Sequence, residues 1–99
     1  MEQIKALNFL GLTNKAGKLV SGNENVINAI QKHKVYLVII AVDASENTKK
    51  KAVDKCIFYN VPYKICFNSE QIGHSIGKES RMLVAITDNG FSNRLKDIE

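Results

Sequence analysis

The sequence has no tryptophan, one proline and two cysteines among its 99 residues, and each shortage argues against a class of protein. Without tryptophan or paired exposed aromatics, the chain lacks the stacking platform typical of proteins that bind extended single-stranded nucleic acid. The single proline, together with the absence of repeats and low-complexity segments, leaves no place for a linker. Cys56 and Cys66 have no CxxC spacing. They therefore indicate buried hydrophobic residues in a reducing compartment, not a disulfide framework.

Long apolar runs are also missing. The longest, Val35–Val42, is far shorter than the roughly 20 residues that cross a bilayer. Glu2 and Asn8 interrupt any apolar stretch of signal-peptide type. His33 and His74 have no cysteine or carboxylate at metal-ligand spacing, so each is expected at the surface or at a helix end. We therefore expect a cytoplasmic protein with no membrane partner, no metal site and no cofactor.

The residues that are present suit one globular domain. Apolar residues make up 44% of the chain, which is enough to bury a core without disulfides or metals. At this length we expect a single domain over residues 1–99, monomeric when free. The net charge of +4 permits a nucleic acid as partner but does not require one.

Hydrophobic periodicity predicts helices and strands in strict alternation, beginning and ending with a helix. Helices are expected near residues 4–14, 22–30, 45–57, 68–77 and 88–98, and strands at Leu19–Ser21, Val35–Val42, Tyr63–Phe67 and Met82–Thr87. Such alternation favours an α/β fold, a three-layer α/β/α sandwich around a central four-stranded mixed sheet. We expect the sheet to be mostly parallel, with right-handed crossovers.

Capping residues mark several helix starts. Asn68 with Gln71 three residues later predicts a capping box. Asp88 is an N-cap candidate for the last helix, and Asp43 or Ser45 for the third. The expected core face of that third helix is Ala52, Val53, Cys56 and Ile57.

No motif for nucleotide binding, serine catalysis or zinc-dependent hydrolysis occurs, so no catalytic residue is expected. Asp43 and Asp88 each follow a predicted strand, at matching places where α/β enzymes often carry catalytic groups. Helix capping explains both positions as well. A small enzyme using these aspartates and the cysteines is therefore an alternative that only a shared pocket would support.

The segment Lys15–Ile30 is the most suggestive stretch, with a basic, glycine-containing loop followed by an amide-rich helix start. Backbone N–H groups and the side chains of Asn23 and Asn25 offer hydrogen bonds there. Lys15 and Lys18 can neutralise phosphate. The segment therefore suits recognition of structured RNA, while a capped helix beside a solvated loop is the simpler interpretation. The run Lys49-Lys50-Lys51 is expected to be mainly a solvated helix face.

Several segments, in order and at their spacing, match a known family. They are Gly11-Leu12, Lys15–Gly22, Ala29-Ile30, Leu37–Ala41 with Asp43, Val61–Tyr63, Ile72-Gly73, Ile76-Gly77 and Val84–Ile86. On these residues the chain resembles the kink-turn-binding ribosomal proteins of the archaeal large-subunit L-seven-Ae type, and most closely their small bacterial YlxQ-type members. The resemblance implies an α/β/α sandwich that binds an internal RNA loop with tandem G·A pairs beside a sharply bent strand.

The resemblance also implies two contact surfaces. The start of the second helix, Gly22–Asn28, would read the G·A pairs, and the loop Gly77–Met82 would hold a flipped-out nucleotide. Helical phase puts Glu24, Asn25 and Asn28 at the base-reading positions, with Asn25 and Asn28 on one face. The family's lysine is replaced by Asn28, which removes a charge-assisted contact. Basic residues are expected to gather around both surfaces and to restore part of the lost affinity through phosphate contacts. They are Lys15, Lys18, Lys32, Lys34 and Arg81.

The expected function is therefore binding of structured RNA, such as a kink-turn of ribosomal RNA, by a non-enzymatic ribosomal or ribosome-associated protein. The alternative is a protein-interaction module of the same fold with little RNA affinity. The expected RNA contacts are Lys15, Lys18, Gly22, Asn23, Glu24, Asn25, Asn28, Lys32, Lys78, Glu79, Ser80, Arg81 and Met82.

Overall fold

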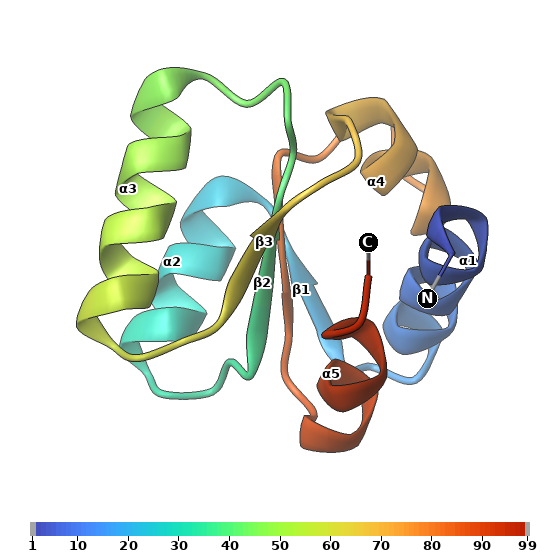
Figure 1. The fold of residues 1–99 in the computed structure, drawn as a ribbon, viewed down its shortest axis with the longest axis horizontal. Coiled ribbons are helices and arrows are strands. Elements are labelled where there is room, and N and C mark those ends of the chain that lie inside the picture. Colours follow the sequence, from blue (N-terminus) through green and yellow to red (C-terminus); the bar gives the residue numbers. More distant parts are fainter. Residues whose placement is uncertain (1, 99) are drawn as a thin grey trace.

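Helices and strands alternate along the chain as the hydrophobic pattern predicts (Figure 1). The computed structural model describes residues 2–98, so Met1 and Glu99 of the expected domain lie outside the described residues. The elements are α1 (Gln3–Lys15), β1 (Leu19–Ser21), α2 (Asn23–Gln31), β2 (Leu37–Ile40), α3 (Glu46–Phe58), β3 (Tyr63–Ile65), α4 (Ser69–Ser75), β4 (Leu83–Ile86) and α5 (Asn89–Leu95). None of the helices in the described part is long and apolar enough to cross a bilayer.

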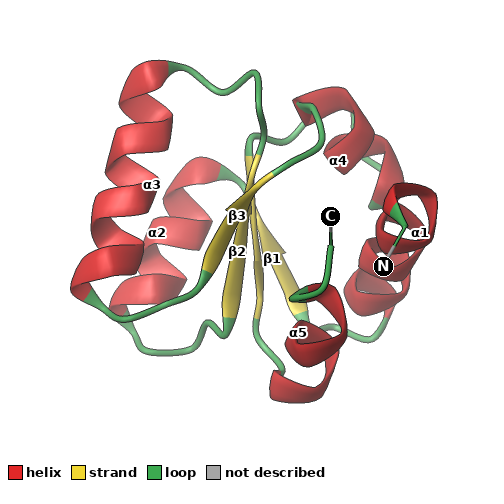
Figure 2. Cartoon of the chain, viewed as in Figure 1, coloured by secondary structure: helices red, strands yellow, loops and turns green. Residues whose placement is uncertain are grey.

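The sheet lies between two layers of helices, with α2 and α3 on one face and α1, α4 and α5 on the other (Figures 1 and 2). This arrangement confirms the three-layer sandwich. The central strands β2 and β4 are buried at every position because helices cover both of their faces. The strand predicted at Val35–Val42 is shorter than expected, since β2 covers Leu37–Ile40 alone. The N–H groups of Tyr36 and Ala41 beside it still donate to Ile86 and Met82, and Val42 is 49% exposed.

The sheet has the strand order β1-β4-β2-β3, and only the β2–β3 pair is parallel. The expectation of a mostly parallel sheet is therefore wrong, although the sheet is mixed as predicted. After α4 the chain turns back to the first residue of that helix, Ser69, whose carbonyl accepts a hydrogen bond from the N–H of Arg81. Because β4 starts at the sheet end where β3 finishes, it must run in the opposite direction.

Side-chain caps fix several helix starts. Asn68 and Gln71 form both hydrogen bonds of the predicted capping box, and Asp88 caps α5, as expected. Ser45 caps α3, accepting a hydrogen bond from the N–H of Thr48.

The packed face of α3 was predicted correctly only in part. Ala52 and Cys56 are fully buried one helical turn apart, but Ile57 is 63% exposed. Its side chain lies about 100° further around the helix than that of Cys56 and points away from the sheet.

Candidate nucleic-acid interface

One end of the sheet brings together segments that are far apart in the sequence; we call it the site end. Here β2 and β3 finish and β4 begins. The N–H of Gly22 donates to the carbonyl of Leu83 at 3.0 Å, and the N–H of Ala41 donates to that of Met82 at 2.8 Å. The start of α2 and the loop at residues 77–82 therefore meet on the first residues of β4.

The start of α2 depends on a residue without a side chain. Gly22 has φ +100°, a conformation that other residues rarely adopt, and offers no side-chain cap. The first-turn N–H groups of Asn23, Glu24 and Asn25 therefore find no side-chain acceptor on the N-cap residue. The Glu24 carboxylate complements the positive end of the helix dipole. The Gly22 amide itself is occupied by β4, so it is not among the donors available to a ligand.

The loop at residues 77–82 is held tightly against α4. The N–H of Lys78 donates to the carbonyl of Gly73 at 2.8 Å, and that of Arg81 to the carbonyl of Ser69 at 2.9 Å. A Cβ atom on Gly73 would lie only 2.5 Å from the Cα atom of Ser80. The loop backbone can approach the helix this closely because residue 73 has no side chain. Lys78, Glu79 and Ser80 are exposed, whereas Arg81 and Met82 are half-buried.

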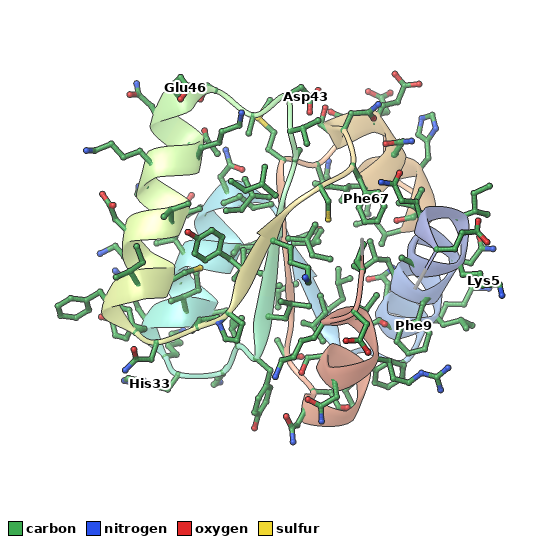
Figure 3. All side chains as sticks on the ribbon, viewed as in Figure 1. Lys5, Phe9, His33, Asp43, Glu46 and Phe67 are labelled. Carbon is green, nitrogen blue, oxygen red and sulfur yellow. The ribbon has the colours of Figure 1, made fainter. Side chains whose placement is uncertain are left out.

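Asp43 joins the end of β2 to the start of α4, and Figure 3 shows its label near that helix. Its carboxylate accepts hydrogen bonds from the N–H and the hydroxyl of Ser69, both at 2.7 Å. These bonds, the hydroxyl first, hold the pKa of Asp43 below its ordinary value of 3.8. The expectation that Asp43 caps α3 is therefore wrong, because its carboxylate serves α4, a helix on the other face of the sheet.

A groove of about 650 Å³ runs between α2 and α3, which lie side by side in Figure 1. The residues lining it are Asn23, Glu24, Ile27, Asn28, Gln31, Asn47, Thr48, Lys51, Lys55 and Leu83. Of the predicted base-reading residues, Glu24 and Asn28 line this groove but Asn25 does not. Asn25 instead donates a side-chain hydrogen bond to the carbonyl of Ser21 at 3.2 Å. The expectation that Asn25 and Asn28 share one face does not hold for this groove.

Four groove residues on α3 were missed as site residues by sequence reasoning: Asn47, Thr48, Lys51 and Lys55. The lysine run was a signal for them, but helical geometry separates its members. Lys49 forms an ion pair with Glu46 at 3.9 Å, while Lys51 lines the groove.

Four of the five expected basic residues lie at the opposite end of the sheet, namely Lys15, Lys18, Lys32 and Lys34. The carbonyl of Lys18 accepts the N–H of Thr87, which follows the last residue of β4. Lys32 is the C-cap residue that follows α2. Figure 3 shows the adjacent His33 at the bottom of the view and Glu46, the first residue of α3, at the top. Of the five, Arg81 belongs to the site end. The prediction that they gather around the start of α2 and the loop at residues 77–82 is therefore wrong, because β1 and α2 each run from one end of the sheet to the other.

The described residues do not assemble an enzyme-like constellation. Asp43 and Asp88 lie at opposite ends of the sheet because β2 and β4 are antiparallel, so their expected matching positions are wrong. Burial raises the pKa of Cys56 to about 11 and raises that of Cys66, which leaves both as protonated thiols at neutral pH. Within residues 2–98, no three histidine, cysteine or carboxylate side chains are grouped so that they could hold a metal ion.

Comparisons with known proteins identify relatives of this chain. The sequence pattern of the ribosomal protein L7Ae/L30e/S12e/Gadd45 family matches residues 5–96. The RNA-binding protein YlxQ of Bacillus subtilis is 51% identical over 87 residues, covering 88% of this chain and 87% of that protein. The protein of the same name from Enterococcus faecium is 45% identical over 94 residues, covering 95% and 90%.

Two solved structures share the fold. A Bacillus halodurans protein of unknown function superimposes with a TM-score of 0.90 at 42% identity, over 93% of both chains. A Giardia lamblia 15.5-kDa RNA-binding protein superimposes with a TM-score of 0.79 at 18% identity, covering 95% of this chain and 81% of that one. At that identity the second likeness supports the fold alone.

Proposed function

This chain belongs to the ribosomal protein L7Ae/L30e/S12e/Gadd45 family, and on that premise we propose that it binds structured RNA through the site end of its sheet. The observation that carries the proposal is the junction at Leu83, where β4 holds the start of α2 beside the loop at residues 77–82. A prearranged pair of surfaces suits a folded RNA element with a fixed shape better than an extended strand. The names of the two curated relatives, both RNA-binding proteins, support the same function.

We assign different tasks to the two surfaces. On α2, the side chains of Glu24 and Asn28 would contact base edges, with Asn25 contacting RNA outside the groove. The amides at Asn23–Asn25 would hold sugar oxygens. The loop of Lys78, Glu79, Ser80, Arg81 and Met82 would close over a bulged nucleotide. These tasks are those of a kink-turn reader, which is the RNA class we propose.

Three of the expected phosphate contacts are separate from this surface. Lys15, Lys18 and Lys32 lie at the other end of the sheet, so they would reach only an RNA that extends past the proposed footprint. Phosphate contacts by these three lysines therefore stay predictions, separate from the two surfaces at the site end. We further propose that the protein acts in the cytoplasm on ribosomal RNA, as one RNA-binding domain without catalytic activity.

The test exchanges residues at the start of α2. Glu24→Asn, Asn25→Glu and Asn28→Lys together would restore the family pattern and should tighten binding to a consensus kink-turn. New charge-assisted and bidentate contacts should contribute on the order of 1–3 kcal/mol. Isothermal titration of both proteins against one kink-turn RNA measures the difference. A control RNA with its G·A pairs replaced by Watson–Crick pairs should show no such gain. Equal affinity of the two proteins for the consensus RNA would refute the alignment of these three residues or the kink-turn as ligand.

One observation favours a second function, that of a protein-interaction module. Large apolar side chains are exposed on the edge strand β3, at Tyr63 and Ile65, and on the last turn of α3, at Ile57 and Phe58. Exposed apolar surface at a sheet edge is suited to protein contacts. An RNA pull-down titrated with salt distinguishes the two functions. RNA capture should fall steeply as salt rises, whereas an apolar protein interface should not.

A further inference from the structure

The groove between α2 and α3 has two chemically different walls. The α2 wall carries the Glu24 carboxylate and the neutral amides of Asn28 and Gln31. The α3 wall carries the ammonium groups of Lys51 and Lys55. Ile27 forms a buried apolar floor. A nucleic-acid strand has the same asymmetry, because its phosphates lie along one side and its base edges along the other.

The two lysines are well placed to bind an anion. They are spaced by four residues on one helix, so their stems project in nearly the same direction, about 6 Å apart along the axis. The ion pair found among the described residues of α3 joins Glu46 to Lys49, leaving both groove lysines outside it. Lys55 is half-buried, so its stem packs along the groove and limits where its ammonium can reach. Across the groove, Glu24 would repel a phosphate and keep it on the α3 side.

We propose that this groove is an RNA-backbone site, in which Lys51 and Lys55 bind phosphates of a strand whose bases face Glu24, Asn28 and Gln31. The inference rests on the proposed RNA function and extends it, because it adds α3 to a footprint otherwise made of the α2 start and the loop at residues 77–82. It also identifies Lys51 and Lys55 as the source of positive charge in this part of the site, since Asn28 carries no charge. The strand would follow the groove away from the site end, with its phosphates toward α3.

A charge-matched pair of variants tests the groove. Lys51→Gln with Lys55→Gln removes two charges from the groove, and Lys5→Gln with Lys96→Gln removes two from α1 and the end of α5. Figure 3 shows Lys5 on the opposite side of the sheet from α3. Affinity for a labelled RNA duplex containing a kink-turn is measured by filter binding at several salt concentrations. The groove variant should bind at least about tenfold more weakly, and the slope of log K against log salt should flatten by about 1.4–1.8, as expected for two lost phosphate contacts. The control variant should change affinity less than about threefold.

Two further measurements guard against loss of folding. Lys51→Arg with Lys55→Arg keeps both charges and should retain the wild-type salt slope. On the wild-type protein, bound RNA should protect Lys51 and Lys55 from acetylation by an acylating reagent, read by mass spectrometry, and leave Lys5 and Lys96 reactive.

The outcomes separate the two proposals. If the wild-type protein does not bind the RNA, the proposed function and the groove both fail. If it binds and Asn28→Ala weakens binding, but the groove and control variants behave alike, the groove proposal is overturned and the RNA function stands. Equal acetylation of Lys51 with and without RNA would overturn the groove proposal as well.

Discussion

Replacing Gly73 with alanine should loosen the loop at residues 77–82. A Cβ atom at this position would lie 2.5 Å from the Cα and 2.6 Å from the amide nitrogen of Ser80. Both are backbone atoms, so no side-chain rotation relieves the clash. To reach ordinary contact at 3.4 Å, α4 and the loop must separate by about 0.9 Å. That movement strains the hydrogen bonds from Lys78 to Gly73 and from Arg81 to Ser69.

The size of the effect follows from opposing contributions. Overpacking a buried site costs about 1–3 kcal/mol, and weakening the two hydrogen bonds adds up to about 1 kcal/mol each. Alanine has a better helix propensity than glycine, which offsets up to about 1 kcal/mol. We therefore expect Gly73→Ala to lower the free energy of unfolding by about 1–3 kcal/mol.

Urea denaturation measures the stability of this variant, and titration with a kink-turn RNA measures its affinity. Gly90→Ala is the control, because the Cβ atom there would meet the Oδ2 atom of the Asp88 cap at 3.2 Å and no backbone of another element. It should change stability by no more than about 0.5 kcal/mol. If Gly73→Ala were as stable as the control and bound RNA equally well, the close contact at Ser80 would not be what shapes the loop.

Three further predictions concern other parts of the fold. Asp43→Asn should destabilise the protein at neutral pH. The pKa of Asp43 is lowered in the folded protein, so the ionised carboxylate stabilises the fold above its ordinary pKa of 3.8. That stabilisation is lost as the pH falls through the folded pKa. By urea denaturation the difference from wild type should be similar at pH 7 and pH 5 and smaller at pH 3, and an undiminished difference at pH 3 would contradict the role of the Ser69 bonds. Native alkylation with iodoacetamide, followed by mass spectrometry, should label the half-buried Cys66 well before the fully buried Cys56, and rapid labelling of Cys56 would argue against its burial. Because burial raises the pKa of Cys56 from 9.0 to about 11 in the folded protein, the free energy of unfolding should fall as the pH rises from 9.0 toward 11. Ser45→Ala should lower the free energy of unfolding by about 0.5–2 kcal/mol through loss of the α3 cap, and a thermal melt identical to wild type would show the cap to be dispensable.

Local features of this fold could be predicted from sequence because short-range chemistry determines them. Strand β1 has the predicted bounds, and the Asn68–Gln71 capping box forms as its spacing indicates. Each depends on residues within a few positions of one another. The limits of β2 were harder to predict, since apolar residues continue beyond the sheet into loops that pack on the core.

Features that depend on distant parts of the chain were predicted less well. The direction of β4 depends on where the chain returns to the sheet after α4, next to the Arg81–Ser69 hydrogen bond. The basic residues were expected to gather because Lys18 and Gly22 are close in sequence, but β1 separates them by its full length. Conversely, Lys51 and Lys55 face α2 only because α3 packs beside it, and no local pattern indicates that.

The hydrogen bond between Gly22 and Leu83 also has a consequence for the order in which the protein is made. Its two residues are 61 positions apart, so the start of α2 cannot take its final place until β4 has been synthesised and has paired. Closing so long a loop is slow compared with forming a helix, which makes this junction a late event in folding. A nascent or truncated chain that ends before Leu83 would contain all of α2 but no anchored helix start. Binding competence would therefore report that β4 has been synthesised and has paired with its neighbours.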